Sequence, residues 1–111
     1  MKESQKSIKV VSELIAFCFK SNAREIDVNI NDKDNEVVIF IKAYIKDMSA
    51  DLLDKLDELN TPRQTQVEEY YWELAGESNQ YQELNLVGMM IDQAYIEYED
   101  NWLQITVFRK K

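Results

Sequence analysis

The chain has 111 residues, a hydrophobic fraction of 45% and a formal net charge of −8. This length and composition exclude a disordered tail and predict a single domain, residues 1–111, with one hydrophobic core. The negative charge argues against a nucleic-acid backbone or an anionic membrane as the partner, and it favours a basic protein or peptide.

The residue types that are missing exclude several kinds of site. The chain has no histidine and only one cysteine, Cys18, which excludes histidine-based catalysis, His-ligated zinc, a thiolate metal cluster and an internal disulfide. Two glycines, Gly76 and Gly88, are too few for a glycine-rich phosphate loop. No signal peptide or membrane span is visible, so we expect a cytoplasmic protein.

Helical periodicity begins near the N-terminus and predicts a helix over residues 4–21. Its predicted buried stripe consists of Ile8, Val11, Leu14, Ile15 and Cys18, widened by Val10 and Phe17. Cys18 is then a core thiol rather than a nucleophile. Phe19 lies outside the stripe and is predicted to face solvent or a partner.

Two strands follow the helix. Residues 25–31 alternate strictly, with Ile26, Val28 and Ile30 predicted to face the core. After a polar turn at residues 32–35, Glu36–Ile45 is the most apolar run and is predicted to be the central strand. Its core-facing set is predicted to be Ile39, Ile41, Ala43 and Ile45, and its opposite set Val38, Phe40, Lys42 and Tyr44.

Three helices are predicted next. Ser49 is the N-cap of the first, which buries Leu52, Leu53, Leu56 and Leu59. Thr61, Pro62 and Gln64 form a capping box that predicts a second helix beginning at Pro62 and ending near Gly76. The third is predicted over residues 80–92, with a stripe of Tyr81, Leu84, Val87 and Ile91.

A second hairpin is predicted from residues 94–99 and 102–110 around the turn Asp100-Asn101. The order is therefore α-β-β-α-α-α-β-β. It predicts an α+β two-layer sandwich, in which helices cover one face of a four-stranded, mainly antiparallel sheet.

Three segments carry a family resemblance. In the first helix Glu13 is followed four positions later by Phe17. The central strand runs into residues 43–48, AYIKDM, and residues 83–89, ELNLVGM, precede the second hairpin. Together with the element order, from about residue 10 to residue 109, these segments resemble the histidine-kinase-like ATPase superfamily (GHKL, or Bergerat fold), which includes anti-sigma-factor serine kinases.

The resemblance implies a nucleotide pocket whose ligand-binding residues are lost. In the family, the position of Phe17 holds an asparagine that binds magnesium, and the position of Ala43 holds an aspartate that reads adenine. Ile45, Asp47, Glu83 and Asn85 stand where the family has glycines. The degenerate pocket positions are therefore Glu13, Phe17, Ala43, Asp47 and Asn85.

A non-catalytic protein-binding or regulatory domain without a cofactor follows from this loss. The alternative is a divergent ATP-binding protein or protein kinase of the same superfamily, with Glu13 as base and Asp47 or Asp51 as metal ligands.

Other polar and aromatic clusters are interpreted as structural. The carboxylates Asp47, Asp51, Asp54, Asp57 and Glu58 are typical of a solvated helix face, as are Glu69 and Glu73. Tyr70 and Tyr71 are predicted to be core residues and Trp72 to project outward.

The uncovered face of the sheet is the predicted partner-binding surface. Alternation places Phe40, Tyr44, Trp102 and Phe108 there, together with Val38 and Thr106. Contiguous aromatic side chains on an open face mark a protein contact, most simply a homodimer. The alternative is a third layer, such as the N-terminus folding across this face.

Overall fold

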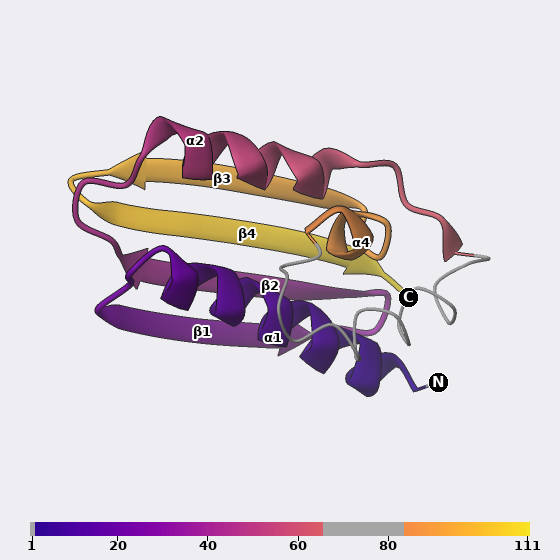
Figure 1. Ribbon diagram of the computed structural model, residues 1–111. Coiled ribbons are helices and arrows are strands. Elements are labelled where there is room, and N and C mark those ends of the chain that lie inside the picture. Colours follow the sequence, from indigo (N-terminus) through magenta and orange to yellow (C-terminus); the bar gives the residue numbers. More distant parts are fainter. Residues whose placement is uncertain (1, 66–83) are drawn as a thin grey trace.

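A computed structural model describes residues 2–65 and 84–111 (Figure 1). The elements in chain order are α1 (Glu3–Lys20), β1 (Glu25–Asp32), β2 (Glu36–Tyr44), α2 (Ala50–Lys55), the 3₁₀ helix η1 (Leu56–Asn60), α4 (Leu84–Gly88), β3 (Gln93–Glu99) and β4 (Trp102–Lys110). None of the helices within these residues is long and apolar enough to cross a membrane.

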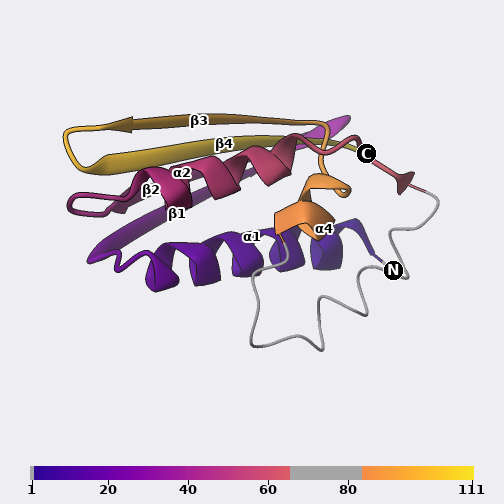
Figure 2. The same ribbon diagram turned by 45° about the horizontal axis from the view of Figure 1, so that its top comes forward.

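The four strands form one sheet in the order β1-β2-β4-β3, and every neighbouring pair is antiparallel. Figure 2 shows α1, α2 and α4 on the same side of this sheet. The prediction of an α+β domain with a four-stranded antiparallel sheet and helices is confirmed. The helix predicted after Thr61 lies largely outside the described residues.

The predicted alternation of β2 is confirmed. Its helix-facing side chains are buried, and the side chains between them are only partly buried. β4 follows the same pattern, because antiparallel pairing brings Ile41 opposite Ile105 and Ala43 opposite Leu103. The core therefore lies between these two central strands and the helices.

The stripe of α1 is confirmed except at one end. Val10, Val11, Leu14, Phe17 and Cys18 are buried and Ile15 is partly buried. The prediction for Ile8 is wrong: its side chain is 60% exposed, because it lies on the flank of α1 toward the edge strand β1. Phe19 is 65% exposed, as predicted.

β1 also departs from the prediction. Its register with β2 places Val28 on the helix side of the sheet, opposite Ile41, and Ile30 opposite Ile39. Val28 and Ile30 are nevertheless 39% and 46% exposed, because β1 lies at the edge of the sheet and α1 does not cover it fully.

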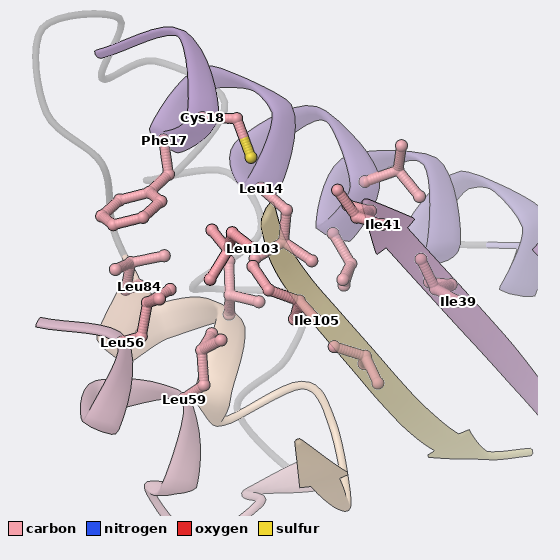
Figure 3. Packing of buried hydrophobic residues seen from close by; sticks show 14 of the residues in the cluster. Leu14, Phe17, Cys18, Ile39, Ile41, Leu56, Leu59, Leu84, Leu103 and Ile105 are labelled. Atoms are coloured by element: carbon pink, nitrogen blue, oxygen red, sulfur yellow. The ribbon is translucent and has the colours of Figure 1, made fainter. Parts of the chain in front are cut away.

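The remaining helices close the core over β4 and β3. Ser49 caps α2 as predicted, since its Oγ accepts a hydrogen bond from the Leu52 amide at 3.2 Å. Figure 3 shows Leu56, Leu59 and Leu84 gathered against the same cluster as Phe17. At Gly88, α4 approaches η1 so closely that a Cβ atom would lie 2.5 Å from the Glu58 carbonyl oxygen.

Two predicted helix ends are wrong. Residues 62–64 are not helical, because the Thr61 hydroxyl donates to the preceding Glu58 carbonyl at 2.8 Å and the Gln64 amide donates to the Met89 carbonyl at 2.9 Å. The last helix ends at Gly88 rather than at Asp92. Its predicted stripe is buried at Leu84, Val87 and Ile91.

Two polar ties hold the ends of the sheet. At one end, Asp100 and Asn101 adopt positive φ in the predicted hairpin turn, and Asn101 accepts a hydrogen bond from Ile45. At the other end, Arg109 is 1% exposed and makes two hydrogen bonds to the Glu3 carboxylate, at 2.6 and 3.2 Å. Arg109 also donates to the Met90 carbonyl. This arginine therefore joins β4 to the start of α1 and to the loop after α4.

Candidate functional site

The two most informative degenerate positions lie in the hydrophobic core. Phe17 is 1% exposed, and its ring points toward Leu84 and Leu56 (Figure 3). Ala43 is fully buried in β2, between Ile26 of β1 and Leu103 of β4. A benzyl ring and a methyl group here have no oxygen with which to bind a cation or accept a hydrogen bond from a base.

The other degenerate positions are Glu13, Asp47 and Asn85, and the structure gives separate contacts for Glu13 and Asp47. The carboxylate of Glu13 is 2.8 Å from the Lys9 ammonium, one turn earlier on α1. Asp47 and Asn85 are exposed, and the Asp47 amide donates to the Asn101 side chain at 3.1 Å. The pocket between the start of α1 and the end of β1 and the pocket at the turn between β1 and β2 include none of the five positions.

The acidic residues of α2 and η1 lie on exposed surface. Within residues 2–65 and 84–111, no three Asp, Glu or Cys side chains are arranged to hold a metal ion. The positions Glu69, Tyr70, Tyr71, Trp72 and Glu73 lie outside the described residues.

The outer face of the sheet, which we define as the face opposite the helices, brings the four predicted aromatic residues together. The rings of Tyr44 and Trp102 are 5.2 Å apart in an edge-to-face arrangement with an interplanar angle of 70°. Phe40 lies opposite Thr106 and Phe108 opposite Val38 in the register of β2 with β4. All four aromatic side chains are partly buried, since directly opposed side chains on neighbouring strands pack against one another.

Sequence reasoning missed one member of this surface, Tyr95, and did not predict the contact that Lys42 makes there. Tyr95 of β3 is 57% exposed, and its ring is 5.8 Å from that of Phe108 at 87°. The Nζ atom of Lys42 lies 4.8 Å from the centre of the Trp102 ring, within cation–π range. The sequence did contain a signal for Tyr95. Residues two apart on a strand face the same side, so Tyr95 shares the outer face with the polar residues Gln93 and Glu97.

The strand register divides the outer face into two zones. Each cross-strand row below runs from β1 through β2 and β4 to β3. The apolar zone consists of the rows Asn31–Val38–Phe108–Gln93 and Asn29–Phe40–Thr106–Tyr95. The acidic zone consists of the rows Asp27–Lys42–Gln104–Glu97 and Glu25–Tyr44–Trp102–Glu99.

The two zones differ in charge but share an apolar centre. In the acidic zone, carboxylates flank the central strands on both sides, and Lys42 is the one cation within its two rows. In the apolar zone the flanking side chains are uncharged. Since successive side chains on one face of a strand lie about 6.8 Å apart, the four rows together span roughly 20 Å. A surface of this size accommodates one helix or strand of a partner.

No protein-family model matches the sequence, and a search of curated proteins found no significant relative.

Proposed function

We propose that this protein is a non-catalytic binding domain, and that the outer face of its sheet binds a protein segment carrying apolar side chains together with Lys or Arg. One observation carries the proposal: an aromatic stripe crosses β2 and β4 on a face that no described helix covers. Aromatic side chains are enriched at the centres of protein interfaces, where they supply large contact areas.

The charge of the outer face indicates the kind of partner. The outer face carries carboxylates on both edge strands, at Glu25, Asp27, Glu97 and Glu99. Two copies meeting through this face would bring these carboxylates together, whereas a basic segment would neutralise them. A basic amphipathic helix of about 13 residues would cover the roughly 20 Å of the four rows.

The fold that we propose is a degenerate histidine-kinase-like ATPase fold, with a regulatory role by analogy. The burial of Phe17 and Ala43 supports it, because both side chains contribute to the core where the family would contact nucleotide and magnesium. Calorimetric titration with ATP and magnesium tests this part. We expect no binding tighter than about 100 μM. Tighter binding would favour a divergent ATP-binding protein instead.

The partner class is tested by selection from a random peptide-display library on the immobilised protein. The enriched peptides are expected to combine aromatic or aliphatic residues with Lys and Arg, and to bind with a dissociation constant below about 100 μM. Enrichment of acidic peptides, or of none, would contradict the proposal.

Two variants locate the binding site of the enriched peptide. Tyr95→Ser removes the most exposed ring of the outer face, and we expect it to weaken binding about tenfold. Phe19→Ser is the matched control, because it removes a ring of similar exposure, 65% against 57%, from α1 on the helix side of the sheet. The control is expected to bind the peptide as the wild type does.

A further inference from the structure

A second apolar surface lies on the helix side of the molecule, at its β1 edge. Four of the five most exposed large hydrophobic side chains of the described residues belong to it: Ile8 and Phe19 of α1, and Val28 and Ile30 of β1. We call this set the α1–β1 strip. The fifth, Tyr95, lies on the outer face.

The members of the strip are distributed along the β1 edge of the sheet. α1 runs back alongside β1, so the start of the helix lies near the end of the strand (Figure 1). Ile8 and Ile30 line a common groove of about 220 Å³, together with Val37 and Ser7. The Ser7 hydroxyl is buried here and has no hydrogen-bond partner among residues 2–65 and 84–111. Phe19 lies at the opposite end of α1, just before the turn into β1.

β1 is also an edge strand that is ready to pair. All eight of its residues are in register with β2, from Glu25 opposite Tyr44 to Asp32 opposite Val37. It contains neither proline nor a bulge in this pairing, and no described strand lies along its other edge. A regular edge strand beside exposed apolar side chains is a site for strand addition.

We infer that a second copy of this chain pairs with β1, antiparallel and centred on Val28. The two sheets would then form one eight-stranded sheet with a two-fold axis at Val28. In this register Ile26 lies opposite Ile30 of the second copy on the helix side. On the outer side, Asp27 lies opposite Asn29 and Glu25 opposite Asn31 of the second copy.

The sequence of β1 is complementary to itself only in this register. No carboxylate lies opposite another, and Arg24 comes opposite Asp32 of the second copy, so that symmetry creates two ion pairs. The Asp32 carboxylate already forms an ion pair with the Lys111 ammonium, with Oδ1 and Nζ 2.6 Å apart. Because the Asp32 side chain is 71% exposed, it has room for a second donor. A shift by one residue would place the outer face of one copy beside the helix side of the other.

Shifts by two residues are also unfavourable. A centre at Ile26 brings Asp27 opposite Glu25 of the second copy, which are like charges. A centre at Ile30 brings Val28 opposite Asp32 of the second copy, an apolar side chain against a carboxylate. The symmetric arrangement centred on Val28 also carries Phe19 of the second copy toward the groove at Ile8 and Ile30.

Light scattering on the full chain tests the dimer. Of two adjacent substitutions, one is expected to weaken the dimer and the other to preserve it. Val28→Lys places two ammonium groups together at the two-fold axis and is expected to raise the dissociation constant of the dimer at least about 100-fold. Asn29→Lys introduces the same charge one residue away, opposite Asp27 of the second copy, and is expected to preserve the dimer. Circular dichroism checks that both variants remain folded.

A charge swap tests the register. Arg24→Asp brings two carboxylates together at each of two symmetric sites and is expected to weaken the dimer about tenfold. The double variant Arg24→Asp with Asp32→Arg exchanges the two charges and is expected to restore the wild-type dissociation constant. Failure of the double variant to restore it would overturn the register.

An introduced thiol gives a direct positive test. Directly opposed residues of antiparallel strands have Cα atoms about 4.5–5.5 Å apart, which suits a disulfide. Val28→Cys is therefore expected to form a disulfide-linked dimer on mild oxidation with diamide, whereas Asn29→Cys is not. A monomeric wild type at about 0.5 mM, or a dimer that Val28→Lys leaves intact, would overturn the inference. Peptide binding at the outer face is independent of either result.

Discussion

At the scale of single residues, two buried polar groups lead to predictions, the thiol of Cys18 and the guanidinium of Arg109. Cys18 is fully buried, and this burial raises the pKa of its thiol from 9.0 to about 11. The folded state therefore holds the thiol proton more tightly than the unfolded chain does. A neutral buried thiol packs as a small apolar side chain, which agrees with the structural role predicted for Cys18.

The sign of this shift gives a pH-dependent prediction. The contribution of Cys18 to stability is fully present below pH 9.0 and is lost as the pH rises toward about 11. The loss amounts to about 2–3 kcal/mol in the free energy of unfolding. Urea unfolding of the wild type and of Cys18→Ala at several pH values measures it by difference. A difference between the two proteins that stays constant from neutral to alkaline pH would contradict the shift.

Arg109 gives a second prediction at this scale. Its guanidinium is buried against the Glu3 carboxylate, so Glu3→Ala removes the negative charge beside a buried positive one, although the hydrogen bond to the Met90 carbonyl remains. Loss of one partner from a fully buried pair costs about 3–5 kcal/mol, and water reaches one third of Glu3, so we expect about 2 kcal/mol. Urea unfolding measures the cost. Ser4→Ala, an exposed change in the same helical turn, is the control and is expected to change stability by less than about 0.5 kcal/mol.

At the scale of elements, the contact between α4 and η1 depends on the absence of a side chain. A Cβ atom at Gly88 would lie 2.5 Å from the Glu58 carbonyl oxygen and 3.1 Å from that of Leu59. Both neighbours are backbone atoms within η1, so the helices themselves must separate to admit a methyl group. The glycine therefore sets how closely the last helix before β3 packs on the core.

We expect Gly88→Ala to destabilise the fold by about 2 kcal/mol, although alanine favours helices more than glycine does. Asn85→Ala on the same helix is exposed, and it is expected to leave stability unchanged or to raise it slightly. Thermal unfolding of the two variants compares them directly. Equal stability of Gly88→Ala and the wild type would show that the close approach is not required.

The elements that the sequence predicted well are those with local causes. The alternation of β2 and β4 and the two-residue turn at Asp100-Asn101 follow from side-chain period and turn chemistry. The helix start at Pro62 failed for a tertiary reason, because the Gln64 amide pairs with the Met89 carbonyl, which is distant in sequence. Capping signals compete with such contacts and do not always prevail.

The candidate site was predictable only in part. Alternation alone placed Phe40, Tyr44, Trp102 and Phe108 on one face. Their pairing with Tyr95 and Lys42 depends on the strand order and register, which side-chain periodicity does not specify. The exposure of Ile8 and Val28 depends on how much of the β1 edge of the sheet α1 covers. This coverage is also set by the packing of the whole fold.

At the scale of the whole molecule, two surfaces lie on different sides of one sheet. The outer face carries the aromatic stripe with flanking carboxylates, and the α1–β1 strip lies on the helix side at the β1 edge. A dimer through β1 would leave both outer faces free and on the same side of the joined sheet. The formal charge of −8 suits a basic partner for these faces.

Chemical-shift mapping tests whether the outer face of the sheet is the binding surface. Isotope-labelled protein is titrated with the basic peptide enriched by selection, and amide shifts are followed by NMR. We predict that the largest shifts fall on β2 and β4 around Phe40, Lys42 and Thr106, and that the core around Phe17 and Ala43 is unaffected. Largest shifts on α1 and α4, with β2 and β4 unperturbed, would contradict the account.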